Sequence, residues 1–518
     1  MRPARASLLI CFLLGCGSGA SEPPDPSGSG GPSSSGGSGT GGQSMLPGSG
    51  GSISSTSGGA SGAQGGASAA AGGSAPTNSG GTTTGGGAGG APTGGAAQGG
   101  SASGSGGGPS SGGGGGNGGT SAGSAGMGGS GAASDDAIAA LRAHLALERA
   151  ARPPLDEQPF ASVPLDEQSA EIARELLWED HVAFVRETRR AEVDANAITI
   201  GDKTLRYDAR VFGAKPAAGR SLYVSLHGGG EAAPSVNDQQ WENQKTLYQP
   251  DEGIYLAPRA PTNTWNLWHE AHIDGLLRRL VEALIVFEDV NPNRVYLMGY
   301  SAGGDGVYQL APRMADSWAA AAMMAGHPND AKPDGLRNIG FTLHVGALDT
   351  AFDRNLVAQE WGELLDALRA ADPEGYVHEV RIHAGKGHWM DLEDAVAVPW
   401  MAQFTRDPAP SRVVWLQDDV PHERFYWLAV PSDQATKGTK VVATRTGQTI
   451  RVEAEGVRTL LVRLSDALVD LDQPVTIEAG STTLFSGPVF RTIGTLAKTL
   501  AERGDPALVY SAEVTVEL

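Results

Sequence analysis

The spacing of hydrophobic and polar residues changes twice after residue 134. Residues 135–152 and 170–190 carry apolar side chains at helical spacing, which predicts two amphipathic helices. From Ala197 the apolar residues alternate around a Gly-Asp turn, which predicts a β-hairpin. Short apolar runs then alternate with helix-like stretches up to about residue 410. This alternation predicts an α/β fold, with a mainly parallel sheet covered by helices on both faces.

The six apolar runs in this central region end in small or polar residues. They are SLYVSLHGGG (221–230), GIYLAPRAP (253–261), RVYLMGYS (294–301), AAAAMMAGHP (319–328), GFTLHVGALD (340–349) and VHEVRIHAGKGH (377–388). In parallel sheets, chemistry gathers at the carboxyl ends of the strands. We therefore expect a functional site at the ends of these runs.

A different pattern covers residues 411–518, where most short alternating segments are separated by turn residues. RFYWLAV (424–430) is predicted to be one of these strands, and residues 492–504 a single inserted helix. The segment predicts a small C-terminal β-sandwich. A pentapeptide, PLDEQ, occurs at 154–158 and again at 164–168, and in each copy Pro followed by acidic residues is predicted to start a helix.

The composition of residues 17–134 sets them apart from the rest of the chain. They consist almost wholly of Gly, Ser, Ala and Thr, and they hold most of the 75 glycines. Such a segment lacks the apolar surface needed to offset its chain entropy, so it is predicted to be a disordered linker. The predicted folded part then divides into a helical extension (135–196), a catalytic domain (197–410) and the C-terminal domain (411–518).

Residues 1–16 have basic residues followed by an apolar run too short to span a bilayer, which predicts an export signal. LLGC resembles the lipobox of bacterial lipoproteins. That resemblance implies lipidation of Cys16 and a membrane anchor, with the protein in the cell envelope, in the outer membrane and facing the periplasm or the surface. A plain secretory signal is the alternative.

Cysteine usage and charge exclude several functions. Cys11 lies inside the signal and no cysteine follows Cys16, which excludes disulfides, thiolate metal sites and a cysteine nucleophile from the folded part. The formal net charge of −20 argues against nucleic acid and against anionic substrates.

The pentapeptide Gly299-Tyr300-Ser301-Ala302-Gly303 lies between a predicted strand and a predicted helix. G-x-S-x-G in this context forms a nucleophile elbow, in which small residues make room for a sharp turn that exposes the serine hydroxyl. The sequence therefore predicts Ser301 as a nucleophile. A serine in an ordinary strand-to-helix turn is the alternative.

A glycine run upstream offers an oxyanion hole. His227 is followed by Gly228, Gly229 and Gly230, whose backbone N–H groups are candidate donors to a developing oxyanion. The N–H of Ala302 would be the second donor.

Partners for the serine follow two later strands. Asp349 comes just after one and His388 after the next, in the chain order Ser, Asp, His that α/β-hydrolases use. His388 would act as general base and acid, and Asp349 would orient it. Asp353 is the alternative acid. His383 is predicted to lie within a strand and to pack or face solvent, and His327, which follows another strand, to line the pocket without acting as the base.

Loop residues near these ends are candidates for the substrate pocket. Trp265, Trp268, Tyr300 and His227 are predicted to line it, with packing of the two tryptophans against the sheet as the alternative. His269 and His272 have a spacing that would suit two metal ligands on a helix. No third ligand lies nearby, so no metal site is expected.

At HGGG, GYSAGG, GALD and GKGHW the sequence resembles the α/β-hydrolase superfamily, over roughly residues 197–406. Within it, the chain is similar to bacterial esterases of the dienelactone-hydrolase-like, polyhydroxybutyrate-depolymerase-like and phospholipase/carboxylesterase-like kinds. The resemblance implies a serine esterase acting on a carboxylic ester without a metal or organic cofactor. The serine departs from true dienelactone hydrolases, which use cysteine.

Two alternatives belong to other classes of function. GYSAGG also resembles the nucleophile motif of prolyl-oligopeptidase-type peptidases, but no repeat of the kind that forms their β-propeller occurs in this chain. The second alternative is a non-catalytic surface lipoprotein whose C-terminal domain binds a polymer.

Overall fold

The computed structural model describes residues 131–518. The export signal, Cys16 and the linker up to residue 130 lie outside the described residues. Helix α1 (Gly131–Leu145) begins before residue 135, the predicted start of the folded part, and Ser134 is fully buried. The predicted linker therefore ends earlier than residue 134. No helix between residues 131 and 518 is both long and apolar enough to cross a bilayer.

The two PLDEQ copies form different structures. In the second, the Asp166 carboxylate accepts a hydrogen bond from the Ser169 N–H at 2.7 Å and caps helix α2 (Glu167–Asp194). The first copy starts no α-helix, so the prediction of a helix there is wrong. Gln158 is extended because Pro159 follows it, and only the short 3₁₀ turn Pro159–Ser162 comes next.

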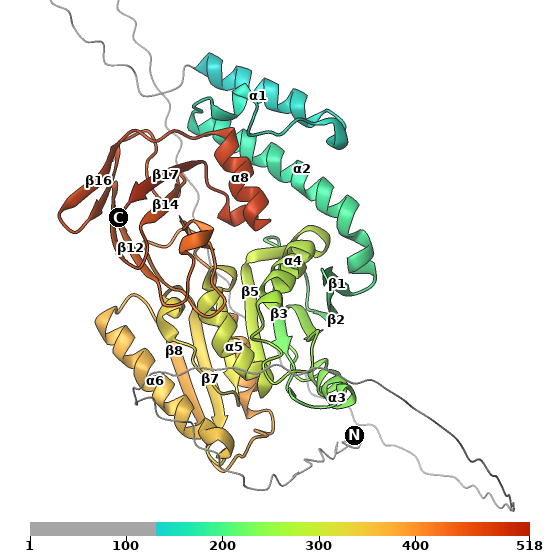
Figure 1. Cartoon of the computed structure of the whole chain (residues 1–518). Helices are drawn as coiled ribbons and strands as arrows, with labels where there is room; N and C mark the ends of the chain where they lie inside the picture. Colours follow the sequence, from blue (N-terminus) through green and yellow to red (C-terminus); the bar gives the residue numbers. More distant parts are fainter. Residues whose placement is uncertain (1–130) are drawn as a thin grey trace, which may run out of the picture. The chain divides into compact units, whose positions relative to one another are not determined.

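The central sheet has the predicted hairpin at its edge and parallel strands beyond it (Figure 1). Its strand order is β1-β2-β4-β3-β5-β6-β7-β8, and all pairs are parallel except β1 with β2 and β2 with β4. The strands are β1 (Ala197–Ile200), β2 (Lys203–Phe212), β3 (Arg220–Leu226), β4 (Gly253–Arg259), β5 (Val290–Tyr300), β6 (Ala320–Met324), β7 (Gly340–Gly346) and β8 (His378–His383).

Helices cover both faces of this sheet. Apolar side chains of α4 (Ala271–Glu288), α5 (Ala302–Arg313) and α6 (Arg354–Ala371) pack in one core cluster with one face of the strands. On the other face lie α3 (Pro234–Gln244), through Gln244, and α7 (Ala397–Met401). Strands β4, β6 and β7 are consequently buried along their whole length. The predicted α/β architecture, a mainly parallel sheet with helices on both faces, is confirmed.

The C-terminal domain has two sheets, as predicted. One has the order β16-β15-β13-β12-β9 and the other β10-β11-β14-β17. The strands are β9 (Arg412–Leu416), β10 (Arg424–Phe425), β11 (Leu428–Ala429), β12 (Lys440–Thr446), β13 (Thr449–Glu455), β14 (Thr459–Leu464), β15 (Val475–Ala479), β16 (Thr482–Gly487) and β17 (Ala512–Glu517), and the inserted helix is α8 (Ile493–Arg503). RFYWLAV is not one strand, because Tyr426 has a φ of 51° and turns the chain between β10 and β11.

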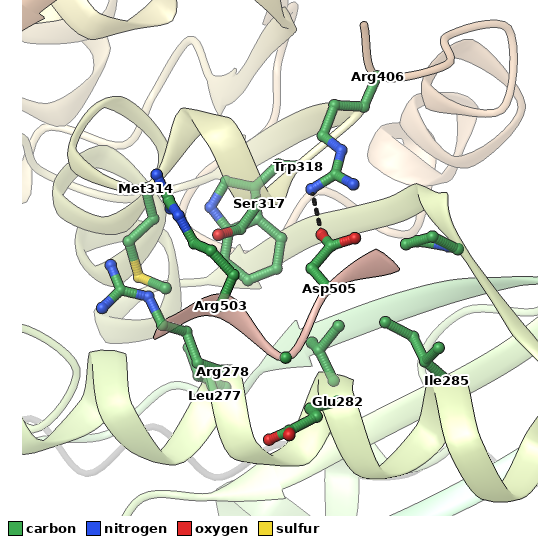
Figure 2. A pocket seen from close by; sticks show the side chains of 13 residues that line it. Leu277, Arg278, Glu282, Ile285, Met314, Ser317, Trp318, Arg406, Arg503 and Asp505 are labelled. Atoms are coloured by element: carbon green, nitrogen blue, oxygen red, sulfur yellow. Dashed lines mark ion pairs between the residues drawn. The ribbon is translucent and has the colours of Figure 1, made fainter. Parts of the chain in front are cut away.

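The C-terminal domain packs on the end of α5 that is farther from Ser301. Apolar residues from both domains form one continuous core cluster. Asp316, in the turn after α5, is fully buried and accepts hydrogen bonds from the Arg503 guanidinium and the Tyr426 N–H. A cavity of about 30 Å³ lies at this interface. Figure 2 shows the side chains that line it, among them Arg406 and Asp505, which form an ion pair of 2.7 Å. Helices α1 and α2 share a further core cluster with α8.

Candidate active site

Ser301 occupies a sharp turn between β5 and α5, with φ 58° and ψ −122°. The turn is held by a hydrogen bond from the Ser301 N–H to the Met324 carbonyl, 2.9 Å. A Cβ on Gly299 would lie 2.2 Å from the Gly303 oxygen, and a Cβ on Gly303 would lie 2.1 Å from the Leu226 oxygen. Larger residues would collide at both positions, which explains why the serine is enclosed by glycines.

The structure brings Ser301, His388 and Asp349 together. His388 Nε2 lies 3.0 Å from Ser301 Oγ, and His388 Nδ1 lies 2.8 Å from Asp349 Oδ2. Asp349 is 2% exposed, whereas the His388 side chain is 40% exposed. Because the buried carboxylate accepts the Nδ1 proton, Nε2 carries the lone pair and accepts from the serine hydroxyl.

Asp349, and not Asp353, is the carboxylate that contacts His388. Asp353 is exposed and lies in a short turn with a φ of 54°. The second oxygen of Asp349, Oδ1, lies 3.8 Å from Arg354 Nη1. The carboxylate therefore contacts His388 with one oxygen and lies near Arg354 with the other.

The glycine run lies beside the serine. A Cβ on Gly228 would lie 3.1 Å from Ser301 Cβ. The N–H of Gly230 donates to Asn237 Oδ1 at 2.8 Å and is therefore already occupied. In the described part of the chain, the N–H groups of Gly228, Gly229 and Ala302 donate to no protein acceptor. Of the four predicted oxyanion donors, these three stay free.

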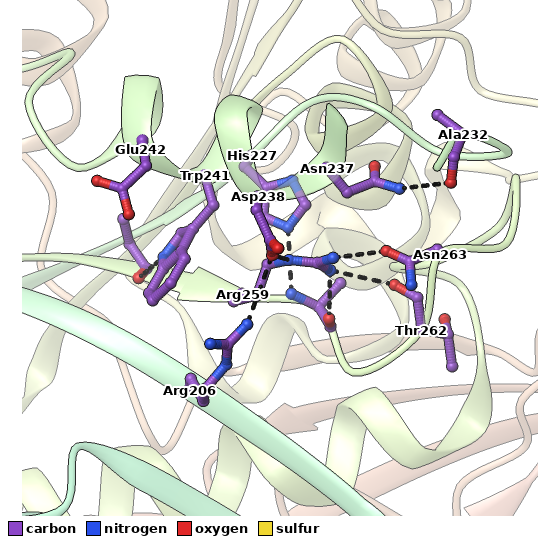
Figure 3. A network of polar contacts seen from close by, with 12 residues as sticks. Arg206, His227, Ala232, Asn237, Asp238, Trp241, Glu242, Arg259, Thr262 and Asn263 are labelled. Atoms are coloured by element: carbon purple, nitrogen blue, oxygen red, sulfur yellow. Dashed lines mark hydrogen bonds and ion pairs between the residues drawn. The ribbon is translucent and has the colours of Figure 1, made fainter. Parts of the chain in front are cut away.

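The His227 side chain contacts the backbone of this run, and Figure 3 shows its ring beside the polar network of Arg259. Its Nε2 accepts from the Ala260 N–H at 3.1 Å, so its Nδ1–H donates to the Gly228 carbonyl, 2.6 Å away. Burial lowers the pKa of His227 to about 4, which keeps the ring neutral. His227 is fully buried, so it does not line a pocket as predicted.

Several polar residues fix the surrounding loops. Asn237 is fully buried and also donates through Nδ2 to the Ala232 carbonyl at 3.3 Å. Arg259 donates to Asp238 at 2.9 Å and to Asn263 at 2.5 Å (Figure 3). Asn237 begins the polar stretch NDQQWENQ, for which the sequence allows two interpretations, a polar contact to the glycine run or a solvated helix start. The Asn237 contact to the Gly230 N–H is of the first kind.

The remaining pocket candidates differ in exposure. Trp268 is fully buried and donates to the His227 carbonyl at 2.9 Å, so it packs the loop rather than lining a pocket. Trp265 is 55% exposed, with its ring 5.5 Å from that of His269. Tyr300 is only 8% exposed, and its hydroxyl points into the histidine loop. Only Trp265 among the four is available at the surface.

Exposed apolar side chains flank the two loops that carry Asp349 and His388. Leu348 is 64% exposed, Phe352 74% and Trp389 40%. The Trp389 ring lies 5.7 Å from the Tyr300 ring, and the Arg354 guanidinium lies 4.9 Å from the Phe352 ring. These residues give the surroundings of the triad an apolar character that the sequence analysis did not predict.

The other histidines do not contact Ser301. The main-chain N–H of His327 donates to Asp305 at 2.6 Å, and His383 stacks on His344. His269 is buried, which lowers its pKa to about 4, while His272 lies 3.3 Å from Glu270. Within residues 131–518, one group of acidic residues, Asp330, Asp418 and Asp419, lies close enough together to suit a metal ion, but Lys437 already pairs with Asp330.

No family model matches the chain, and no curated protein matches it. Solved structures similar to it include a thermostable esterase, with 19% identity, TM-score 0.31, and coverage of 40% of this chain and 62% of that one. The chain thus spans less than two thirds of the length of that esterase.

Two other solved structures are similar to the same extent. A poly(3-hydroxybutyrate) depolymerase from Bordetella parapertussis shows 16% identity and a TM-score of 0.29, covering 40% of this chain and 86% of that one. A putative dipeptidyl aminopeptidase IV from Bacteroides ovatus shows 15% identity and a TM-score of 0.30, covering 40% of this chain and 35% of that one. At these TM-scores the likenesses carry no functional argument.

Proposed function

We propose that this protein is a serine hydrolase that cleaves carboxylic esters through an acyl-enzyme. The observation that carries the proposal is the hydrogen-bonded chain from Asp349 through His388 to Ser301. His388 Nε2 takes the hydroxyl proton as Ser301 Oγ attacks the ester carbonyl carbon, and it then gives that proton to the leaving alcohol. Water then attacks the acyl-enzyme with His388 again as the base, and the carboxylic acid is released from Ser301 Oγ. Asp349 holds His388 in the tautomer that carries its proton on Nδ1, and it stabilises the imidazolium that forms during the reaction.

The oxyanion formed during attack is stabilised by backbone donors. Among residues 131–518, the N–H groups of Ala302, Gly228 and Gly229 donate to no protein acceptor. Ala302 directly follows Ser301, and Gly228 lies against the Ser301 side chain. The positive end of α5 adds a favourable field. Loss of one such donor typically costs about 3 kcal/mol of transition-state stabilisation.

The surroundings favour an uncharged ester with an apolar group. Leu348, Phe352, Trp389 and Trp265 are exposed on or beside the loops of the triad and the glycine run. The net charge of −20 disfavours an anionic substrate. Burial of an apolar group against such side chains contributes about 25 cal/mol for each Å² removed from water.

A fluorophosphonate probe tests the proposal on the full-length protein. We expect labelling of the wild type and of Ser432→Ala, an exposed serine in the C-terminal domain. Ser301→Ala should not be labelled and should not hydrolyse p-nitrophenyl esters. Equal labelling of Ser301→Ala and the wild type would refute the proposal. Faster cleavage of matched aminoacyl anilides than of esters would instead assign a peptidase.

We also propose that the protein is exported and anchored through a lipid on Cys16. The signal-like residues 1–16 and the LLGC sequence support this. The wild type should partition into the detergent phase of Triton X-114, and Cys16→Ala should remain in the aqueous phase. Aqueous partitioning of both proteins would contradict the anchor.

A further inference from the structure

The Tyr300 side chain connects the nucleophile turn to the loop that carries His388. Its hydroxyl donates to the His388 carbonyl oxygen at 2.5 Å and accepts from the Met390 N–H at 3.2 Å. The two hydrogen bonds fix the backbone on both sides of Trp389. The phenol is 8% exposed, and burial raises its pKa, so the hydroxyl keeps its proton and can donate.

The ion pairs of this loop lie at the surface. Lys386 pairs with Asp391 at 2.9 Å and with Glu393 at 3.0 Å, but both carboxylates are about half exposed or more. Such surface pairs contribute little. For residues 388–390, the only other backbone hydrogen bond outside regular elements runs from the Glu393 N–H to the Met390 carbonyl. The tyrosine hydroxyl is thus a buried anchor for the backbone of residues 388–390, in addition to the His388–Asp349 hydrogen bond and the buried Met390 side chain.

Tyr300 is also the residue directly before Ser301. Tyr300 is therefore bonded covalently to the nucleophile and through its hydroxyl to the backbone of the base, although Tyr300 and His388 are 88 positions apart in sequence. The Tyr300 and His388 rings meet edge to face, with centroids 5.9 Å apart. This contact limits rotation of the imidazole away from Ser301 Oγ.

We infer that Tyr300 is a positioning residue of the reaction and not a substrate contact: it fixes His388 Nε2 within reach of Ser301 Oγ. The inference rests on the proposed function. Replacing Tyr300 by Phe would leave the His388 carbonyl and the Met390 N–H without partners. Because such groups are costly to leave unpaired, the loop would move to find other partners, and the base would move with it. A displacement of about 1 Å can cost roughly 100-fold in rate.

Strand β5 offers a matched control. Tyr296 is also buried, and its hydroxyl donates to a backbone carbonyl, that of Phe404, at 2.9 Å. It makes no hydrogen bond to the triad or to the histidine loop. Tyr296→Phe therefore removes a comparable buried hydroxyl from the same strand without altering the support of His388.

The experiment compares kcat, KM and the thermal midpoint of wild type, Tyr300→Phe and Tyr296→Phe on a soluble p-nitrophenyl ester. We expect kcat of Tyr300→Phe to fall about 10- to 100-fold with KM changed less than about twofold. Tyr296→Phe should keep kcat within about twofold, with a similar drop in midpoint.

Three outcomes overturn the inference. They are an unchanged kcat in Tyr300→Phe, an equal loss of kcat in both variants, and unfolding of Tyr300→Phe alone at the assay temperature, which would make the tyrosine a support of the fold. Failure of the proposed function can be distinguished from these three outcomes, because the wild type would then be neither labelled by fluorophosphonate nor active on esters.

Discussion

The Asn237 side chain holds the Gly230 N–H at 2.8 Å and fixes the glycine run beside Ser301. A Cβ at Gly229 would lie 2.1 Å from Asn237 Oδ1, so the asparagine and the glycines are closely fitted to each other. The side chain that shapes the proposed oxyanion site thus comes from helix α3, and not from the run itself.

Removing this contact should weaken catalysis. Asn237→Ala would leave the Gly230 N–H unpaired and make the glycine run less rigid. The N–H groups of Gly228 and Gly229 would then be less well oriented toward the oxyanion. We expect kcat/KM to fall about 10- to 100-fold, which is no more than the complete loss of one oxyanion donor would cause. Gln239→Ala, an exposed position on the same helix, is the control and should behave as the wild type. Equal activity of the two variants would show that Asn237 does not position the donors.

The choice of acid can be tested directly. In Asp349→Asn the amide would favour the wrong tautomer of His388, and we expect kcat to fall roughly 10³- to 10⁴-fold. Asp353→Asn changes an exposed carboxylate of the same loop and should keep kcat within about twofold. Steady-state ester hydrolysis measures both. The reverse order of effects would make Asp353 the acid.

Acid should destabilise the folded protein through its buried neutral histidines. Burial lowers the pKa of His227 from 6.5 to about 4 and that of His344 to about 3. Below pH 6.5 the unfolded chain binds protons that the folded chain does not, so the free energy of unfolding should fall as the pH drops from 6.5 toward 4. Each such group contributes at most about 1.4 kcal/mol per pH unit.

Urea unfolding at several pH values between 4 and 7 measures this slope. His344→Gln removes one of the groups without touching Ser301, His388 or Asp349, and its slope should be shallower than that of the wild type. Identical slopes would mean that His344 does not contribute.

The two domains should unfold together. They share a continuous core, and the buried Asp316 pairs with Arg503 across their interface. Asp316→Ala would leave the buried Arg503 guanidinium without its carboxylate partner, and we expect a loss of about 3–5 kcal/mol in the free energy of unfolding.

The control for this prediction is a surface ion pair between the same two domains. Asp330 and Lys437 are 2.7 Å apart with more than half of each side chain exposed, so Asp330→Ala should cost less than about 1 kcal/mol. Calorimetry should show one transition in the wild type. Two separate transitions, or equal losses in the two variants, would contradict the coupling.

The sequence by itself determined the features that depend on local spacing. Alternation of apolar runs with helix-like stretches predicted the sheet, because burial on both faces requires continuous apolar strands. Gly299 and Gly303 predicted the sharp turn at Ser301, since the room for that turn depends on residues close in sequence. The prediction of a helix at the first PLDEQ copy was wrong, because the proline that follows this copy makes Gln158 extended.

Tertiary structure alone decided which groups meet. His388 contacts Asp349 and not Asp353, although both acids follow the same strand. His227 and Trp268 lie in the loops that predicted a pocket, but their side chains point into the core. The Gly230 N–H is occupied by Asn237, and Tyr300 supports the histidine loop. Each of these outcomes depends on the direction of a side chain and on a partner from another element, and spacing along the chain encodes neither.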